Sequence, residues 1–400
     1  MKFRKQLALT LVIQSIGGGS TLLAMLWIGM KSGPEQQGQF NQLKSLIDLS
    51  IALAAMGIPQ ALYVYVQSNQ MSFNRAWKTS LWIGPLGMAT GAVVMLWSTQ
   101  SSPALIAVVG ATAVAGCLHA QWRVLTLLSP QTIWFNLVTV APQVLLLPIA
   151  AWIAASGHAS QLGMSNGMLL AWATGAVVAG LVLKRLPARP LYKEAVPIQK
   201  IFTHGLATGV TGFLSILTIV LMQKAAQQSF GDAGMGVISM AMLLTQIPMT
   251  PLNYALPLLL KNRLTQLHTP QYYSYFLMAT TALMMILVCA VWLLGAVRSD
   301  LWMGFAYSGI HLLLAIFLLA GSAEIVLRIM SVEAQATMRP WKSTLAEAVR
   351  VCTLLGLWLG SQSERNPQTL EMLATFWLIA TIAAMVTFKL SNRYSRLLRG

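Results

Sequence analysis

The chain has 400 residues, 56% of them hydrophobic and 9% charged, whereas a soluble globular domain carries roughly 25% charged residues. Its net charge is +16, but the basic residues lie in short segments between apolar runs and form no single patch, which disfavours nucleic-acid binding. This composition excludes a soluble fold and predicts an all-α integral membrane protein, whose apolar surface faces lipid.

Twelve apolar runs follow one another along the chain, and a transmembrane helix needs about 20 mainly apolar residues. The first run is longer than the apolar core of a signal peptide, so we predict a retained span. The runs lie at 7–30, 46–67, 79–98, 104–128, 132–154, 166–183, 203–223, 233–258, 272–297, 303–327, 343–361 and 370–389.

Lysine and arginine alternate in frequency between successive connections. With the N-terminus in the cytoplasm, the inner segments hold 19 of these residues and the outer segments five. This bias predicts a multi-pass protein with both termini cytoplasmic. A basic, proline-containing segment divides the chain, so we expect an N-terminal six-helix lobe at 1–183, a cytoplasmic linker at 184–202, and a C-terminal six-helix lobe with a short cytoplasmic tail at 203–400.

An internal repeat supports this division. Both halves read as an outer loop, a Gly-x4-Gly motif and an apolar helix that ends at a proline. A shift of 198 residues superimposes Gly33 on Gly231, Gly38 on Gly236, Leu46 on Leu244 and Pro59 on Pro257.

The stretch Ser32 to Val66, SGPEQQGQFNQLKSLIDLSIALAAMGIPQALYVYV, resembles the second-helix region of polysaccharide flippases. These belong to the multidrug/oligosaccharidyl-lipid/polysaccharide exporter superfamily. Phe230 to Leu260 echoes this pattern, and Ser331 to Leu359 is similar to the turn between the tenth and eleventh helices of that family.

The resemblance implies two six-helix bundles around a central cavity that opens alternately to each side of the bacterial inner membrane. The implied substrate is an undecaprenyl-diphosphate-linked oligosaccharide, flipped during O-antigen or other surface-polysaccharide synthesis. The implied partners are membrane lipid, the polysaccharide polymerase and the chain-length machinery.

Ionisable residues inside spans are costly and therefore mark candidate sites. Arg123 in the fourth span follows His119 by four residues, on the same helix face, and is a candidate to hold the diphosphate. The alternative is that Arg123 reaches the cytoplasmic interface. His119 and, in the first span, Gln14 are further substrate-binding candidates. Gln14 lies beside a run of glycines, which indicates either a bending, cavity-lining helix or close helix packing.

Glu347 and Arg350 lie three apart in the eleventh span, and Glu324 ends the tenth span. We expect Arg350 to bind substrate and Glu347 to couple an ion, because protonating Glu347 would release Arg350 to hold diphosphate. Ordinary charge pairing explains the same spacing. Glu324 is a further ion-coupling candidate, although an interfacial pair with Arg328 is the simpler interpretation.

Asp48 in the second span follows Lys44 by four residues. Asp48 is a candidate site for H+ or Na+, and Lys44 and Lys224 are candidates to contact an anionic substrate. A solvated pair at the outer mouth explains Lys44 and Asp48 equally, and Lys224 suits a helix anchor.

No catalytic constellation, nucleotide-binding loop or metal motif is apparent, so we expect no enzyme, cofactor or metal site. The alternative function is an ion-coupled multidrug or small-molecule antiporter of the same superfamily. A membrane polymerase or glycosyltransferase acting on lipid-linked sugars is disfavoured, because such enzymes tend to carry a large extracytoplasmic loop, and the longest expected here runs only from about Lys31 to Ser45.

Overall fold

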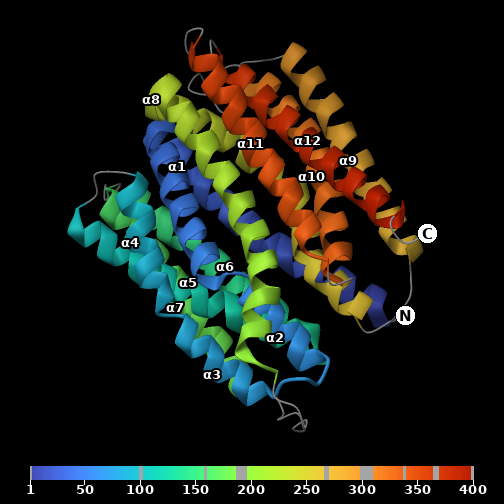
Figure 1. Cartoon of the computed structure of the whole chain (residues 1–400). Helices are drawn as coiled ribbons and strands as arrows, with labels where there is room; N and C mark the ends of the chain where they lie inside the picture. The colour runs from blue at the N-terminus through green and yellow to red at the C-terminus, as the bar shows by residue number, and fades with distance from the viewer. Residues whose placement is uncertain are drawn as a thin grey trace. The chain divides into compact units, whose positions relative to one another are not determined.

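The computed structural model describes residues 2–98, 102–156, 160–185, 196–264, 270–297, 310–336, 339–363 and 369–397. Over these ranges the regular structure is helical (Figure 1). The helices are α1 (Lys2–Ala55), α2 (Ile58–Gln67), α3 (Phe73–Ile83), α4 (Leu86–Ser98), α5 (Pro103–Leu125), the short 3-10 helix η1 (Thr126–Leu128), α6 (Thr132–Ser156), α7 (Gln161–Lys184), α8 (Ile198–Leu264), α9 (Pro270–Val297), α10 (Ile310–Ala336), α11 (Trp341–Ser363) and α12 (Leu370–Leu397).

Nine helices in the described ranges are long and apolar enough to cross a membrane. Two of them, Ala8–Ala55 and Gln199–Gln246, have 48 residues each. At 1.5 Å per residue each would extend about 70 Å, more than twice the roughly 30 Å hydrocarbon core, so each supplies two spans. With the shorter apolar helix at Thr281–Leu293, the prediction of an all-α membrane protein with about twelve spans is confirmed.

The two double-length helices are each broken at one glycine. Gly33 in α1 has φ 86° and ψ 173°, and Gly231 in α8 has φ 69° and ψ −171°. Such positive φ angles favour glycine, which has no Cβ. These are the positions that the repeat superimposes, so the sequence repeat is also a repeat of backbone geometry. The outer loop expected from Lys31 to Ser45 was wrong: one non-helical residue suffices, and helix resumes at Pro34, because proline fits a first helical turn.

The second pair of glycines in the repeat, Gly38 and Gly236, lie against one another. A Cβ on Gly38 would lie 2.9 Å from Asp232 O and from Gly236 N, and a Cβ on Gly236 would overlap Pro34 O. Beside this contact, Gln39 Nε2 donates a hydrogen bond to Asp232 Oδ2 at 3.3 Å. The absence of side chains at both glycines therefore lets the backbones of α1 and α8 approach closely.

The chain forms two compact units. Unit 1 comprises Met1–Trp27 and Gln42–Ile216, and unit 2 comprises Ile28–Asn41 and Leu217–Gly400. The predicted lobes at 1–183 and 203–400 stay a prediction, since residues 186–195 of the linker lie outside the described ranges.

Each unit is organised around one helix that packs against several others. In unit 1, α5 packs against α2, α3, α4, α6 and α7. In unit 2, α10 packs against α9, α11 and α12, and α11 packs along α12 (Figure 1). Arg123 lies on α5, Glu324 on α10, and Glu347 and Arg350 on α11.

Candidate functional site

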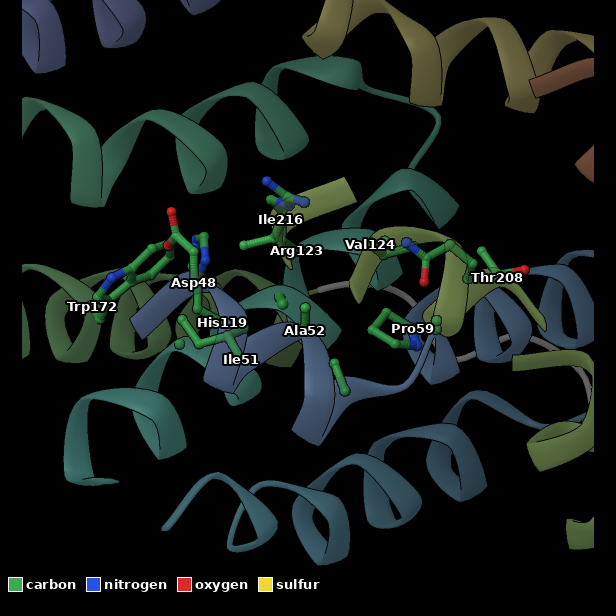
Figure 2. Close-up of a pocket in the computed structure, with 17 residues that line it drawn as sticks. Asp48, Ile51, Ala52, Pro59, His119, Arg123, Val124, Trp172, Thr208 and Ile216 are labelled. Carbon is green, nitrogen blue, oxygen red and sulfur yellow. The ribbon is translucent and has the colours of Figure 1, made fainter. Parts of the chain in front are cut away.

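Unit 1 contains a pocket of about 300 Å³ (Figure 2). Its wall combines small residues, which leave room, with a few polar and aromatic side chains. The lining residues are Asp48, Ile51, Ala52, Ala55, Gly57, Pro59, Gln60, Gly116, His119, Ala120, Arg123, Val124, Trp172, Thr208, Gly209, Gly212 and Ile216.

Helix α5 supplies the two central polar residues of this pocket. The helix begins after Ser102, whose Oγ accepts a hydrogen bond from Leu105 N at 3.3 Å. His119 and Arg123 lie one turn apart, and both line the pocket, as the spacing of four predicted. Arg123 stands in the last turn of α5, where the carboxyl end of the helix dipole favours a cation.

His119 is buried and held on two sides. Its Nε2 lies 2.9 Å from Val138 O, and because a carbonyl oxygen only accepts, Nε2 is the donor. Its ring packs against Trp172 of α7, with centroids 5.3 Å apart. The imidazole is thus a fixed part of the wall, and Trp172 adds an aromatic surface beside it.

Asp48 and Lys44 form the ion pair that their spacing predicts. Lys44 Nζ lies 2.6 Å from Asp48 Oδ2, and both side chains are 28% exposed. Asp48 lines the pocket, whereas Lys44 stands one turn away on the same helix. The pair therefore brings little net charge to this end of the pocket.

One side of the pocket is built from a strained break between α1 and α2. Met56 and Gly57 both have positive φ, at 43° and 68°. A Cβ on Gly209 of α8 would overlap the carbonyl carbon of Met56, so the break packs directly on the α8 backbone. A non-glycine residue in the left-handed region costs energy and persists only where the surroundings enforce it.

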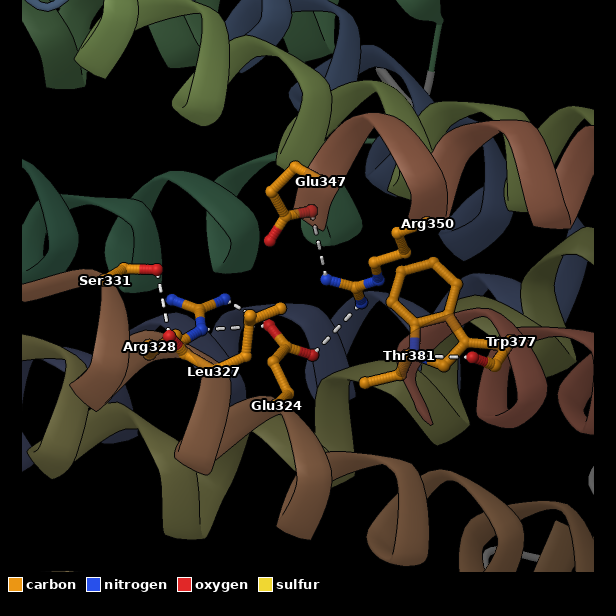
Figure 3. A network of polar contacts seen from close by, with 8 residues as sticks. All are labelled: Glu324, Leu327, Arg328, Ser331, Glu347, Arg350, Trp377 and Thr381. Carbon is orange, nitrogen blue, oxygen red and sulfur yellow. Dashed lines mark hydrogen bonds and ion pairs between the residues drawn. The ribbon is translucent and has the colours of Figure 1, made fainter. Parts of the chain in front are cut away.

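Unit 2 contains a buried cluster of charges (Figure 3). Arg350 is only 1% exposed. Its Nη2 lies 3.3 Å from Glu324 Oε2, its Nη1 lies 3.5 Å from Glu347 Oε2, and its guanidinium carbon lies 4.5 Å from the centroid of Trp377. Arg350 is therefore enclosed by two carboxylates and an aromatic ring.

Glu324 is shared between two arginines. Arg328 Nε donates to Glu324 Oε1 at 2.9 Å, in addition to the ion pair of Glu324 with Arg350. The four side chains form a chain of alternating sign, Arg328, Glu324, Arg350 and Glu347, with no net charge. The i,i+3 spacing predicted the pair with Glu347; the contact with Glu324, 26 residues away, was not anticipated.

The remaining candidates do not join either cluster. Gln14 is buried, and its Nε2 donates to Asn136 Oδ1 at 3.2 Å, while Asn136 Nδ2 donates to Thr10 Oγ1 at 3.0 Å. Gln14 thus links α1 to α6 away from the pocket lining. Lys224 is half-buried on the part of α8 that belongs to unit 2.

Of the 17 lining residues, the sequence analysis proposed only Asp48, His119 and Arg123; the polar or aromatic residues that it missed are Gln60, Trp172 and Thr208. None of the three carries a charge, and no sequence pattern marked them. Within the described ranges, no group of three or more His, Cys, Asp or Glu residues is placed to hold a metal ion.

No protein-family model and no curated protein matches the chain. Solved structures do. A multidrug resistance MATE family transporter of the MOP superfamily, in an outward-facing conformation, matches with a TM-score of 0.74 and 16% identity, over 100% of this chain and 97% of that chain. A MATE in the straight conformation matches with a TM-score of 0.72 and 16% identity, over 100% of this chain and 97% of that chain. A Vibrio cholerae MATE transporter matches with a TM-score of 0.68 and 18% identity, over 98% of both chains. Across its full length, the chain has the fold of MATE transporters of the MOP superfamily.

Proposed function

We propose that the protein is a membrane transporter that works by alternating access. The observation that carries this proposal is the full-length match to MATE transporters, including one described as outward-facing. The two helices broken at equivalent glycines, Gly33 and Gly231, support it, because inverted or repeated helix pairs are typical of such transporters.

The first candidate function is multidrug antiport, with small organic molecules as substrates. One structural neighbour is described as a multidrug resistance MATE family transporter. The small residues around the pocket leave an apolar space, with Trp172 as a flat aromatic surface. Such a space accommodates small organic molecules of varied shape.

The second candidate is an undecaprenyl-diphosphate-linked oligosaccharide. One feature of the pocket favours it: Arg123 lines the pocket, while the carboxylate of Asp48 is paired with Lys44. A guanidinium favours an anionic group and can hold phosphate oxygens in a bidentate manner. The sequence resemblance to polysaccharide flippases around Ser32 to Val66 points the same way.

Transport by the purified protein in proteoliposomes distinguishes these candidates. One set of vesicles carries a fluorescent organic cation, and the other carries an undecaprenyl-diphosphate-linked sugar, each with and without a proton or sodium gradient. Movement of only the lipid-linked sugar, lost in Arg123→Ala, supports the flippase. Gradient-driven efflux of only the cation, retained in Arg123→Ala, supports the antiporter. Failure to move either compound would argue against both.

Ion coupling is tested in the same vesicles. Asp48, Glu324 and Glu347 are the candidate carboxylates, and the variants Asp48→Asn, Glu324→Gln and Glu347→Gln each remove one charge. The variant that abolishes gradient dependence while leaving passive exchange intact identifies the coupling residue. If the gradient has no effect on the unmodified protein, none of the three couples an ion.

We further propose that the protein resides in a bacterial inner membrane with cytoplasmic termini. Reporter fusions after Ser391 and within 186–199 should both report cytoplasm. A periplasmic signal from either fusion contradicts this topology. The polysaccharide polymerase and chain-length machinery are partners only under the flippase alternative.

A further inference from the structure

The His119 ring meets a different neighbour on each side. Its Nε2 lies 2.9 Å from Val138 O of α6. Its Cδ2 lies against α7, because a Cβ built on Gly175 would lie 3.0 Å from that atom. Trp172 packs against the ring, with the two planes inclined by 57°. Since Nδ1 is on the opposite side of an imidazole from Cδ2, the Nδ1 edge is the one left to face the pocket that His119 lines.

The hydrogen bond to Val138 decides what Nδ1 can do. A carbonyl oxygen only accepts, so Nε2 carries the proton, and in the neutral ring Nδ1 is then an acceptor. Within the described ranges, Nδ1 has no hydrogen-bond partner. His119 is 1% exposed, and a buried polar atom without a partner has lost the hydrogen bond that it would make in water. A ligand in the pocket that offers a proton to Nδ1 restores that bond.

Arg123 lines the same pocket one turn further along α5, at a rise of about 6 Å (Figure 2). A guanidinium only donates hydrogen bonds, so the wall places a charged donor near a neutral acceptor. An ammonium group would satisfy Nδ1 but would be repelled by Arg123. A hydroxyl group satisfies Nδ1 without adding a positive charge. The other acceptor in this wall with a charge, the Asp48 carboxylate, already pairs with Lys44 at 2.6 Å.

We propose that His119 determines specificity in this pocket, because its Nδ1 accepts a hydrogen bond from a hydroxyl group next to the anionic group that Arg123 holds. The ligand class is a hydroxylated anion, such as a polyol phosphate or a sugar phosphate. Gly175 positions the ring, since its missing side chain leaves room for Cδ2. This role of His119 rests on the second candidate function, in which Arg123 holds an anionic substrate.

Two small phosphates test this role. Glycerol 3-phosphate and propyl phosphate have the same carbon chain, but only the first carries hydroxyl groups. At about pH 8 both are dianions, so neither phosphate group offers a proton of its own. Binding is measured by calorimetry on the purified full-length protein in detergent. We expect glycerol 3-phosphate to bind roughly tenfold more tightly, the value of one hydrogen bond in a buried site, and Arg123→Ala to weaken both compounds.

Two variants of His119 separate its nitrogens. In His119→Gln the amide nitrogen reaches the place of Nε2 and still donates to Val138 O, but no acceptor remains at the place of Nδ1. In His119→Asn the amide oxygen lies near the place of Nδ1. We expect His119→Gln to lose the preference for glycerol 3-phosphate and His119→Asn to keep part of it. Thermal unfolding of each variant confirms that it is folded, and the comparison on the unmodified protein does not depend on either variant.

The outcomes separate this role from the function on which it rests. Equal binding of the two phosphates, lost in Arg123→Ala, would overturn the role of His119 and leave the anionic site intact. Absence of binding, or binding that Arg123→Ala leaves unchanged, would refute the anionic substrate and the role of His119 with it. A preference that survives in His119→Gln and is lost in Asp48→Asn would assign the hydroxyl to Asp48 and also overturn the proposal.

Discussion

The buried Arg350 of unit 2 and the half-buried Arg123 of unit 1 have different surroundings. Arg350 of unit 2 is enclosed by Glu324, Glu347 and Trp377, so protein groups compensate its charge. Arg123 of unit 1 lines a pocket of about 300 Å³ beside His119. An arginine in the low-dielectric interior needs compensation, which can come from fixed carboxylates or from the contents of a cavity. The comparison predicts different roles: Arg350 stabilises unit 2, and Arg123 contacts a ligand in the pocket.

The largest expected effect is on stability in unit 2. Arg350→Met leaves Glu324 and Glu347 buried with one cation fewer, so we expect the free energy of unfolding to fall by about 3–5 kcal/mol. Thermal unfolding of the purified protein in detergent measures this. The double variant Arg350→Met with Glu347→Gln should recover part of the loss. An unchanged unfolding temperature in Arg350→Met would mean that the cluster does not stabilise unit 2.

The matching change in unit 1 should act on binding instead. Arg123→Ala should change the free energy of unfolding little, yet weaken binding of an anionic substrate by roughly 10–100-fold, the value of a charged hydrogen bond. Arg123→Lys should recover part of the affinity, because it keeps the charge but loses the bidentate geometry. Binding and unfolding measured on the same preparations separate the two roles. If Arg123→Ala unfolds as easily as Arg350→Met, the contrast between the units is lost.

A third prediction concerns the close approach of α1 and α8. Gly236→Ala places a methyl group against Pro34 O, and we expect a loss of about 1–3 kcal/mol in the free energy of unfolding. The matched control is Gly19→Ala, where a Cβ would meet nothing within 4 Å. That control should be neutral or slightly stabilising, because alanine favours a helix. Equal tolerance of both variants would show that the two backbones do not need to touch.

The smallest expected effect is at the strained break beside the pocket. Met56→Gly removes the penalty of a left-handed conformation, and we expect a gain of roughly 1 kcal/mol in the free energy of unfolding. Ala54→Gly, two residues earlier and within helix α1, should instead lose about 0.5–1 kcal/mol. A loss in both variants would indicate that Met56 stabilises the protein through its side chain more than its backbone costs.

The sequence was informative wherever the cause of structure is local. Apolar runs of membrane length predicted the spans, and the glycines at 33 and 231 predicted two equivalent features. The same glycines misled the expectation of an outer loop, because sequence does not reveal that one residue with positive φ can replace a loop. Spacing also placed His119 and Arg123 on one face of α5, where the structure has them.

Contacts between helices that are far apart in the sequence could not be predicted from the sequence alone. Glu324 approaches Arg350 because α10 and α11 pack in a particular register, which no spacing rule encodes. Trp172 reaches His119 from α7 for the same reason. The hydrogen-bond partner of Gln14, Asn136, lies 122 residues away, and only packing of α1 against α6 brings the two together.

The contact between the repeated glycines has a consequence for biosynthesis. Gly38 and Gly236 are 198 residues apart, so the segment 28–41 leaves the ribosome long before the part of α8 against which it packs. At about 5–20 residues per second, the delay is roughly 10–40 s. During that interval the backbone around Gly38, with its polar neighbours Gln37 and Gln39, must lie in the membrane or at its surface without its final partner. Completion of unit 2 therefore waits for the second half of the chain, and the two halves cannot mature as independent products of translation.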